Sequence, residues 1–360
     1  MKRRMFALLC AGCLAASLLT GCGSKSDSNP SAPDDSTPTT ETGDQPTYKF
    51  RVSHLGAVNT WYDDVPREMV AQMNEKAGYE AFQMETYTSG QLAGSDSENA
   101  ELVNNGTVEM TFTANDGVVY LNGSLERWNV ISMPFIFPNE DAVALFYDSE
   151  YGKDLIDEAT NATDVIVYPG FVTGSAILGS NKGEIHLPAD IAGQKIRTTA
   201  STLVMKTVEA WGATAINVSW GETYSALQQG TVDGMINGLS SWFGGAFGEV
   251  CKYGTVVNSY INNNVPLVNK AWYNSLTPEL QGIFDEGMAW LVSEMRSQYV
   301  ELSKDYLAQI DAQGMKVISL TDEERQVWVD ASAPVVESQA DIAGGIDYVN
   351  EVQDFISGLV

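Results

Sequence analysis

The stretch that decides the fold is QKIRTTASTLVMKTVEAWGATAINVSWGETYSALQQG, residues 194–230. It starts with a strand-like run over 194–198, continues with apolar residues at helical spacing over 202–211, and becomes extended again over 215–218. A second helix is predicted from 219 to 230, where a glycine ends it. Strands that alternate with helices are typical of an α/β architecture.

The same alternation extends toward the N-terminus. As far back as Tyr48, the apolar residues either have the spacing of one helical face or form short runs typical of strands. The predicted strands cover 49–53, 80–87, 108–112 and 165–168, and the predicted helices cover 63–76 and 97–105. Two α/β units are therefore expected, one on each side of about residue 173.

One predicted helix is unusually long. It starts at Thr277-Pro278-Glu279, which supplies a cap, a first-turn proline and an acid, and no proline follows before Gly314. At 1.5 Å per residue, its roughly 36 residues would reach about 54 Å, which is longer than one small domain is wide. We therefore expect it to contact both units, although glycines at 282 and 287 weaken its first turns.

Two helix starts have the spacing of a capping box, in which a hydroxyl and an acid three residues later bond each other's backbone amides. They are Ser219 with Glu222, and Thr321 with Glu324.

The N-terminus has the pattern of an export signal. Three basic residues over 2–4 precede an apolar run over 5–19, which is too short to remain as a membrane span. The run ends in Leu19-Thr20-Gly21-Cys22, similar to the bacterial lipoprotein processing box, so 1–22 is predicted to be a lipoprotein signal peptide and Cys22 the lipidated residue. The alternative is an ordinary signal peptide with an incidental cysteine. Residues 23–47, rich in Ser, Thr, Pro and Asp, predict a flexible tether.

Composition excludes several classes of protein. The 360 residues include 20 basic and 47 acidic side chains, a net charge of −27, which repels nucleic acid. Without the signal peptide, 17 basic and 47 acidic residues remain, a charge of −30. A hydrophobic content of 44% is enough for a sizeable core. Of the four cysteines, only Cys251 would remain as a free thiol, so no intramolecular disulfide is expected.

The chemistry of an enzyme is missing from the sequence. There is no Gly-rich phosphate loop, no H-E-x-x-H, no C-x-x-C after Cys22 and no G-x-S-x-G. The two histidines, His54 and His186, are too few to suggest a zinc site, and a structural role is favoured for His54. No cofactor, metal or catalytic residue is therefore predicted, and a secreted hydrolase is the weakest alternative.

Arg197 stands out because basic residues are scarce. It ends the extended run Lys195-Ile196-Arg197 directly before a helix, where open α/β sheets gather their ligands. A guanidinium at that point can clamp a carboxylate through two parallel hydrogen bonds. A structural ion pair with a neighbouring acid is an equally good interpretation of the residue alone.

Several segments together resemble one family. LPADIAGQKIR at 187–197, WGA at 211–213 and ETYSALQQGTVDG at 222–234 are similar to the solute-binding subunit of tripartite ATP-independent (TRAP) transporters. Weaker matches flank them in the family's order. They are SGQL at 89–92, MPF at 133–135, YGKDL at 151–155, EVCKY at 249–253 and LTPELQ at 276–281.

The resemblance implies a two-lobed α/β fold like that of periplasmic binding proteins, in which each lobe is a sheet flanked by helices, strands are exchanged between lobes, and a long helix contacts both. The lobes would close on a small solute and pass it to TRAP membrane subunits. The matching division places lobe I at 48–173 plus about 263–302, and lobe II at 174–262 plus about 303–360.

The resemblance also implies site residues. Arg197 matches the arginine that pairs with the ligand carboxylate, Asn237 matches an asparagine that contacts the same group, and Trp220 matches a stacking aromatic. Many members have a second arginine about twenty residues before the first, where this chain has Ala176. A missing charge-assisted contact weakens anion binding by about 1.5–3 kcal/mol. A monocarboxylate is therefore favoured over a dicarboxylate.

Other residues are candidates for the cleft from their position alone. Trp61 and Trp242 offer aromatic surface, although packing in the core explains each of them as well. Asn115, with Asp116, offers polar contacts just after a predicted strand. The asparagines at 262–264 do the same near a crossover, or simply form a turn.

The expected protein is an extracytoplasmic, lipid-anchored and monomeric receptor that delivers a small organic acid to a TRAP importer. The alternative is a receptor of the same fold that signals through a membrane partner. Neither the identity of the solute nor the type of cell envelope follows from the sequence.

Overall fold

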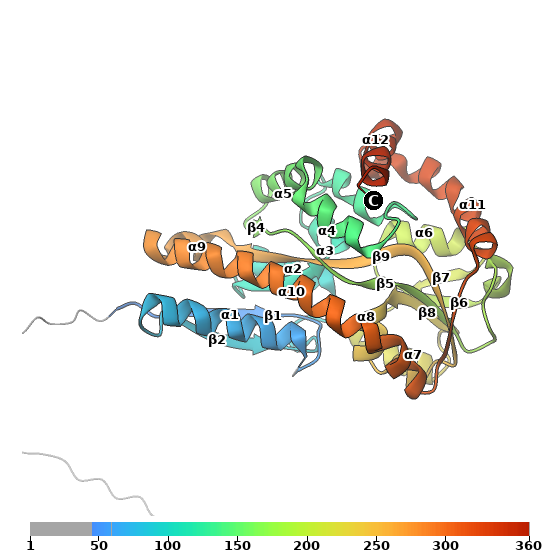
Figure 1. Ribbon diagram of the computed structural model, residues 1–360, viewed down its shortest axis with the longest axis horizontal. Helices are drawn as coiled ribbons and strands as arrows, with labels where there is room; N and C mark the ends of the chain where they lie inside the picture. Colours follow the sequence, from blue (N-terminus) through green and yellow to red (C-terminus); the bar gives the residue numbers. More distant parts are fainter. Residues whose placement is uncertain (1–44, 59, 360) are drawn as a thin grey trace, which may run out of the picture. The chain divides into compact units, whose positions relative to one another are not determined.

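The computed structural model describes residues 45–58 and 60–359, which belong to one unit of the chain (Figure 1). The predicted signal peptide, Cys22 and nearly all of the predicted tether lie outside these residues. Within the described part of the chain, no helix has the length and apolarity needed to cross a bilayer.

A sheet of ten strands forms the centre of this unit. Its strands follow the order β2-β1-β3-β9-β5-β8-β6-β7, and β4 and β10 also pair with β9. The strands are β1 Tyr48–Ser53, β2 Phe82–Tyr87, β3 Met110–Ala114, β4 Val165–Val167, β5 Phe171–Ser180, β6 Lys195–Thr198, β7 Thr214–Asn217, β8 Gly234–Gly238, β9 Tyr253–Asn269 and β10 Lys316–Ser319.

Helices flank this sheet (Figure 1). The α-helices are α1 Trp61–Ala77, α2 Asp96–Asn104, α3 Asn115–Leu121, α4 Glu140–Asp148, α5 Glu150–Ala162, α6 Thr202–Ala210, α7 Trp220–Gln228, α8 Leu239–Gly244, α9 Lys270–Ser275, α10 Pro278–Ala312, α11 Asp322–Gln339 and α12 Ile346–Ser357. Short 3₁₀ helices are η1 Glu126–Ser132, η2 Pro188–Ile191, η3 Phe247–Glu249 and η4 Ala340–Ala343. The predicted two-lobed α/β fold is confirmed.

Two long strands, β5 and β9, connect the two halves of the sheet. One end of β9 pairs with β3 and β4, whereas its other end pairs with β10, and β5 runs antiparallel beside most of it. The pairing of β5 with β9 is irregular between Val172 and Gly174 and again between Ser175 and Ile177. Gly174 has a φ of 128°, and a Cβ there would lie 2.5 Å from the backbone nitrogen of Leu239. Only glycine fits this bend between the halves.

The long helix predicted from Thr277 is confirmed as α10, which has 35 residues. The Thr277 side chain caps it by accepting a hydrogen bond from the amide of Leu280 at 3.3 Å. In Figure 1, α10 runs from beside α1 to α8, and it contacts both helices. Near its far end, the rings of Tyr306 and Phe243 stack at 5.1 Å.

The two predicted capping boxes differ in the structure. Thr321 and Glu324 form one, in which each side chain accepts from the other residue's amide, at 3.2 and 2.8 Å. At the start of α7, Ser219 instead donates its hydroxyl to the Glu222 carboxylate at 2.8 Å, and its side chain caps no backbone amide. The amide of Trp220, the first residue of α7, donates to the carbonyl of Gly94 at 3.1 Å, so this helix start is held by a distant loop.

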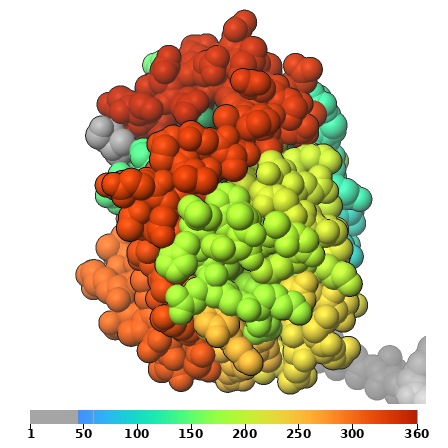
Figure 2. Space-filling model, turned by 90° about the vertical axis from the view of Figure 1, so that its right-hand side faces the viewer, coloured from blue at the N-terminus to red at the C-terminus, as the bar shows by residue number. Residues whose placement is uncertain are grey.

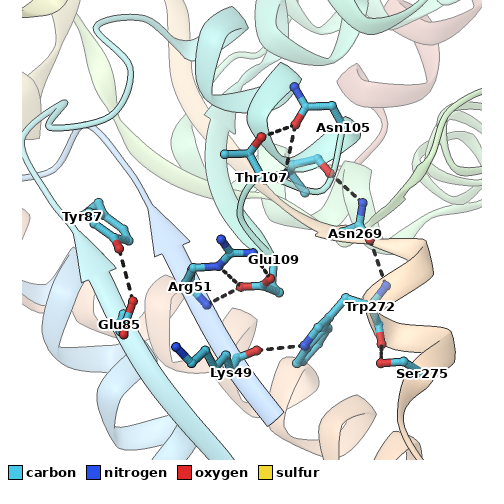
Figure 3. A network of polar contacts seen from close by, with 11 residues as sticks. Lys49, Arg51, Glu85, Tyr87, Asn105, Thr107, Glu109, Asn269, Trp272 and Ser275 are labelled. Atoms are coloured by element: carbon cyan, nitrogen blue, oxygen red, sulfur yellow. Dashed lines mark hydrogen bonds and ion pairs between the residues drawn. The ribbon is translucent and has the colours of Figure 1, made fainter. Parts of the chain in front are cut away.

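A polar network fixes the end of the sheet near β1 (Figure 3). The guanidinium of Arg51 on β1 bonds the carboxylate of Glu109, which lies just before β3, through two contacts of 2.5 and 3.0 Å. The indole of Trp272 on α9 donates to the carbonyl of Lys49 at 2.9 Å. Asn269 caps α9 by accepting from the amide of Trp272 at 2.9 Å. These bonds tie the first strand to the end of β9.

The C-terminal helices lie over both parts of the chain. Figure 2 shows this segment in red above the green and yellow residues of the middle of the chain. Trp328 of α11 meets Trp211, the residue after α6, edge to face at 4.8 Å. Phe355 of α12 contacts Tyr151 of α5 at 4.7 Å. The segment 303–360, predicted for lobe II, therefore also contacts residues predicted for lobe I, and the lobe boundaries stay a prediction.

Candidate functional site

A cavity of about 990 Å³ is lined by residues from both halves of the sequence. Loops and helix starts beside the sheet supply most of this lining. The contributing segments are 55–68, 89–98, 114–116, 197–200, 217–224, 237–247, 262–264 and 298–309. A cavity of this size holds a small organic molecule with room to spare.

Arg197 lines this cavity from β6 and is only 3% exposed. Its Nε donates to the carbonyl of Val218 at 3.0 Å, whereas its buried Nη1 has no hydrogen-bond partner among the described residues. None of the ion pairs within the described part of the chain includes Arg197. Burial lowers the pKa of its guanidinium to about 10, so the group stays charged at neutral pH. The structure thus holds a buried cation with a free donor, which disfavours the structural ion pair.

Asn237 lies on β8 and also lines the cavity, with 5% of its surface exposed. Its side-chain oxygen accepts from the amide of Gly238 at 2.8 Å and from the side chain of Asn262 at 3.4 Å. These contacts fix the amide plane, so the NH₂ group is the part of Asn237 left to donate to a solute.

Two of the predicted tryptophans lie at the cavity. Trp220, at the start of α7, is half-buried and meets Phe247 edge to face at 5.1 Å. Trp61, at the start of α1, is 8% exposed, and its ring lies 5.7 Å from that of Phe171. Trp61 therefore belongs both to the core and to the lining.

Trp242 and Asn115 lie outside the lining. Trp242 is fully buried, and its indole nitrogen donates to the carbonyl of Ile177 at 3.1 Å. The amide of Asn115 donates to the hydroxyl of Ser132 at 3.3 Å, and its oxygen accepts from Tyr147 at the same distance. Both side chains serve packing and internal hydrogen bonding, so we do not retain them in the proposed site.

The asparagine run belongs to β9 rather than to a turn. Asn262 and Asn264 line the cavity, whereas Asn263 is buried and accepts from the hydroxyl of Tyr147 at 2.6 Å. The alternation follows from the two faces of a strand.

Two acids, Asp96 and Asp116, line the cavity. The sequence predicted Asp116, beside Asn115, as a source of polar contacts, but it did not single out Asp96. Asp96 begins α2 and accepts from the amide of Ala114 at 3.0 Å, and Asp116 lies in α3. Burial and the nearby charge of Asp116 raise the pKa of Asp96 to about 7, and Arg197 partly opposes this effect. Burial also raises the pKa of Asp116.

The charge of the lining is strongly uneven. Among the residues around the cavity, Arg197 is the single cationic side chain. The acids that share this lining are Asp64, Glu68, Asp96, Glu98, Asp116 and Glu222. Six carboxyl groups therefore accompany one guanidinium.

Comparison with known proteins identifies the family. Residues 52–341 match the family described as "Bacterial extracellular solute-binding protein, family 7", also named DctP. The chain belongs to this family. As a DctP-family protein it is an extracytoplasmic solute-binding receptor rather than an enzyme, and the resemblance to TRAP solute-binding subunits is confirmed.

Related proteins cover most of this DctP-family chain. The C4-dicarboxylate-binding protein DctB of Bacillus subtilis is 26% identical over 298 residues, 82% of this chain and 83% of that protein. The C4-dicarboxylate-binding periplasmic protein DctP of Vibrio cholerae is 29% identical over 267 residues, 73% of this chain and 76% of its own.

Solved structures share the fold. A TRAP periplasmic solute-binding protein of Sulfurospirillum deleyianum with bound succinate has a TM-score of 0.79 and 24% identity, over 86% of this chain and 99% of its own. The sugar acid binding protein DctPAm of Advenella mimigardefordensis, in complex with galactonate, has a TM-score of 0.82 and 24% identity, over 88% of this chain and 100% of its own.

Proposed function

We propose that this receptor binds a small organic acid with a single carboxylate, which Arg197 holds, and delivers it to TRAP membrane subunits. One observation carries the proposal. The Arg197 guanidinium is buried, charged and without an ion-pair partner among the described residues. A buried charge is costly unless it is paired, so its persistence is best explained by an anion that binds there.

The relatives support an acid as the solute. DctB of Bacillus subtilis and DctP of Vibrio cholerae are named for C4-dicarboxylates, and the two structural neighbours hold succinate and galactonate. All of these solutes carry a carboxylate. This chain differs from a dicarboxylate site in its charge, because the lining contains one cation and Ala176 on β5 is fully buried. A single carboxylate matches that charge.

The other lining groups complete the proposed site. Asn237 donates a second hydrogen bond to the carboxylate, while Trp220 and Trp61 cover the apolar body of the solute. The solute would join the two lobes and stabilise the closed state, since it contacts both only when they are together. Stabilisation should then grow with the ratio of solute concentration to Kd.

Arg197→Ala tests this function. Native mass spectrometry of the purified protein and a thermal-shift screen of organic acids first identify a binding acid. Calorimetry should then show at least a tenfold loss of affinity for that acid in the variant, because a charge-assisted contact is worth about 1.5–3 kcal/mol.

Lys195→Ala is the matched control, because this exposed lysine on the same strand lies outside the cavity lining. It should bind as the wild type does. Unchanged affinity in Arg197→Ala, with an unchanged unfolding midpoint, would disprove the carboxylate clamp. A screen in which only sugars or cationic solutes raise the melting temperature would disprove the class of solute.

A further inference from the structure

A solute with only a negative charge does not explain why acidic side chains line the cavity beside Arg197. Asp96 and Asp116 come from two different helices, yet their carboxyl groups interact with each other and with Arg197. Neither forms an ion pair with that arginine within the described residues. Among the described residues, both signs of charge therefore line the same cavity without forming a direct ion pair.

The state of Arg197 shows that this part of the cavity is built for a ligand. Arg197 is only 3% exposed, lines the cavity, and keeps Nη1 without a partner among the described residues. If the acids served only to balance this guanidinium, direct pairing would be the more stable arrangement. The free donor and the acids without an ion pair instead match complementary groups of a ligand.

We infer that the solute carries a protonated amine in addition to its carboxylate, so that Arg197 and Asn237 hold the carboxylate while Asp96 and Asp116 receive the ammonium group. This inference rests on the proposed role of Arg197 and names the class of solute as amino acids and their close derivatives. A solute of this kind has no net charge, which suits a protein of net charge −27.

The contacts of Asp96 leave it free to accept from such an amine. One oxygen, Oδ1, accepts the amide of Ala114, and Asp96 forms no ion pair within the described part of the chain. An ammonium group has three donors, so it can satisfy carboxyl oxygens of both acids. Aromatic rings in the same lining, including Trp61 and Tyr62, add favourable surface for a cation.

The same acids disfavour the other solutes in the family. A second carboxylate, as in succinate, would lie among like charges and lose affinity. A sugar acid would donate hydroxyl groups to Asp96 and Asp116 without supplying a positive charge. The three classes can therefore be separated by matched probes and by variants that keep the size of each acid.

The experiment uses the full mature chain and four sets of probes in thermal-shift and calorimetric titrations. The first set contains the L-amino acids and the series from glycine to 6-aminohexanoate, and the second contains the same acids without their amine. The third set contains the dicarboxylates from malonate to adipate, and the fourth contains the sugar acids galactonate and gluconate. An amino acid is expected to bind at least tenfold more tightly than its amine-free counterpart.

Asp96→Asn and Asp116→Asn should each reduce that preference at least tenfold. Glu101→Gln, which makes the same change of charge on α2 outside the cavity lining, should leave it unchanged. Arg197→Ala should weaken the binding of amine-bearing and amine-free acids by the same factor, so this variant reports on the carboxylate site alone.

Each other outcome overturns one identified step. If amine-free acids or dicarboxylates bind as tightly as amino acids and still depend on Arg197, the ammonium site is wrong and the carboxylate site stands. If sugar acids bind and the two asparagine variants weaken that binding, Asp96 and Asp116 accept hydrogen bonds from hydroxyl groups instead. If no acid binds, or if Arg197→Ala binds normally, the proposed function fails as well.

Discussion

Asp96 links the chemistry of the cavity to the stability of the protein. Its pKa is raised from an ordinary value near 3.8 to about 7, by burial first and then by Asp116. An acid whose pKa is higher in the folded than in the unfolded chain binds its proton more tightly when folded. Its contribution to the free energy of unfolding is therefore present at low pH and is lost as the pH rises from about 4 to about 7.

The first prediction follows from this sign. At pH 8, Asp96→Asn without solute should unfold with a free energy about 1–2 kcal/mol higher than the wild type, since one pKa unit corresponds to about 1.4 kcal/mol and water screens the half-buried carboxyl. At pH 4 the two proteins should be equally stable. Urea unfolding at both pH values measures the difference, and a constant difference would show that Asp96 does not titrate there.

A second prediction concerns protons exchanged on binding. The groups that face Asp96 include Asp116, Arg197, the phenol of Tyr62, the amide of Ala114 and the hydroxyl of Thr113. An ammonium group beside Asp96 would lower its pKa and expel its proton, so affinity should rise up to about tenfold between pH 6 and 8. A carboxylate of the solute beside Asp96 would instead raise the pKa of Asp96, so a proton would be taken up on binding and affinity would fall with rising pH. Calorimetry in buffers of different ionisation enthalpy counts these protons, and Asp96→Asn should reduce the slope, with Asp116 accounting for any slope that remains.

At the scale of elements, close packing explains one of the two glycines in α10. A Cβ on Gly287 would lie 2.7 Å from the sulfur of Met73 on α1, whereas a Cβ on Gly282 meets nothing within 4 Å. The sequence showed both glycines only as weak points in a helix. The structure shows that Gly287 lets α1 approach α10, and Gly282 is without such a contact among the described residues.

The third prediction uses this pair as its own control. Gly287→Ala should lower the free energy of unfolding by about 1–2 kcal/mol, because buried methionines must move to admit the methyl group. Gly282→Ala should raise it by about 0.5–1 kcal/mol, since alanine is the better helix former. Urea denaturation measures both. Equal effects from the two variants would contradict the close approach of α1 and α10.

Elements with strong local signals were predictable from the sequence, and elements shaped by distant partners were not. The spacing of apolar residues located α1 closely, and the capping signal at Thr277 located the start of α10. β9 was not predicted as a strand of 17 residues, because Asn262–Asn264 and Pro266 have the composition of a turn. Pairing with β5, β3 and β10 along its length overrides that local preference.

At the scale of the whole molecule, the site was predictable only in part. The family resemblance gave Arg197, Asn237 and Trp220, and all three line the cavity. For Trp242 the sequence left the cleft and the core equally open, and the structure places its side chain in the core. Asp96 was missed as a ligand contact because its significance depends on Arg197, which is about a hundred residues away in the sequence. Asp116 was named, beside Asn115, as a source of polar contacts.

The fourth prediction concerns the proposed lipid anchor, which lies outside the described residues. The full-length protein expressed in bacteria should partition into detergent and carry the mass of attached lipid on a mature chain that begins at Cys22. Cys22→Ser should lose both properties, because serine cannot carry the thioether-linked lipid and the acyl chains are the membrane anchor. A wild-type protein that stays in the aqueous phase and carries no lipid mass would favour an ordinary signal peptide.

The bond from the Trp220 amide to the Gly94 carbonyl gives one further consequence. Gly94 lies in the range proposed for lobe I and Trp220 in that proposed for lobe II, so separation of the lobes would break this bond. Hydrogen–deuterium exchange at the single Trp220 amide should therefore be slow with solute and fast without it. Neighbouring amides inside α7, such as that of Leu227, should exchange at nearly the same rate in both cases. The exchange rate of this one backbone amide would then report how often the receptor opens, without an attached probe.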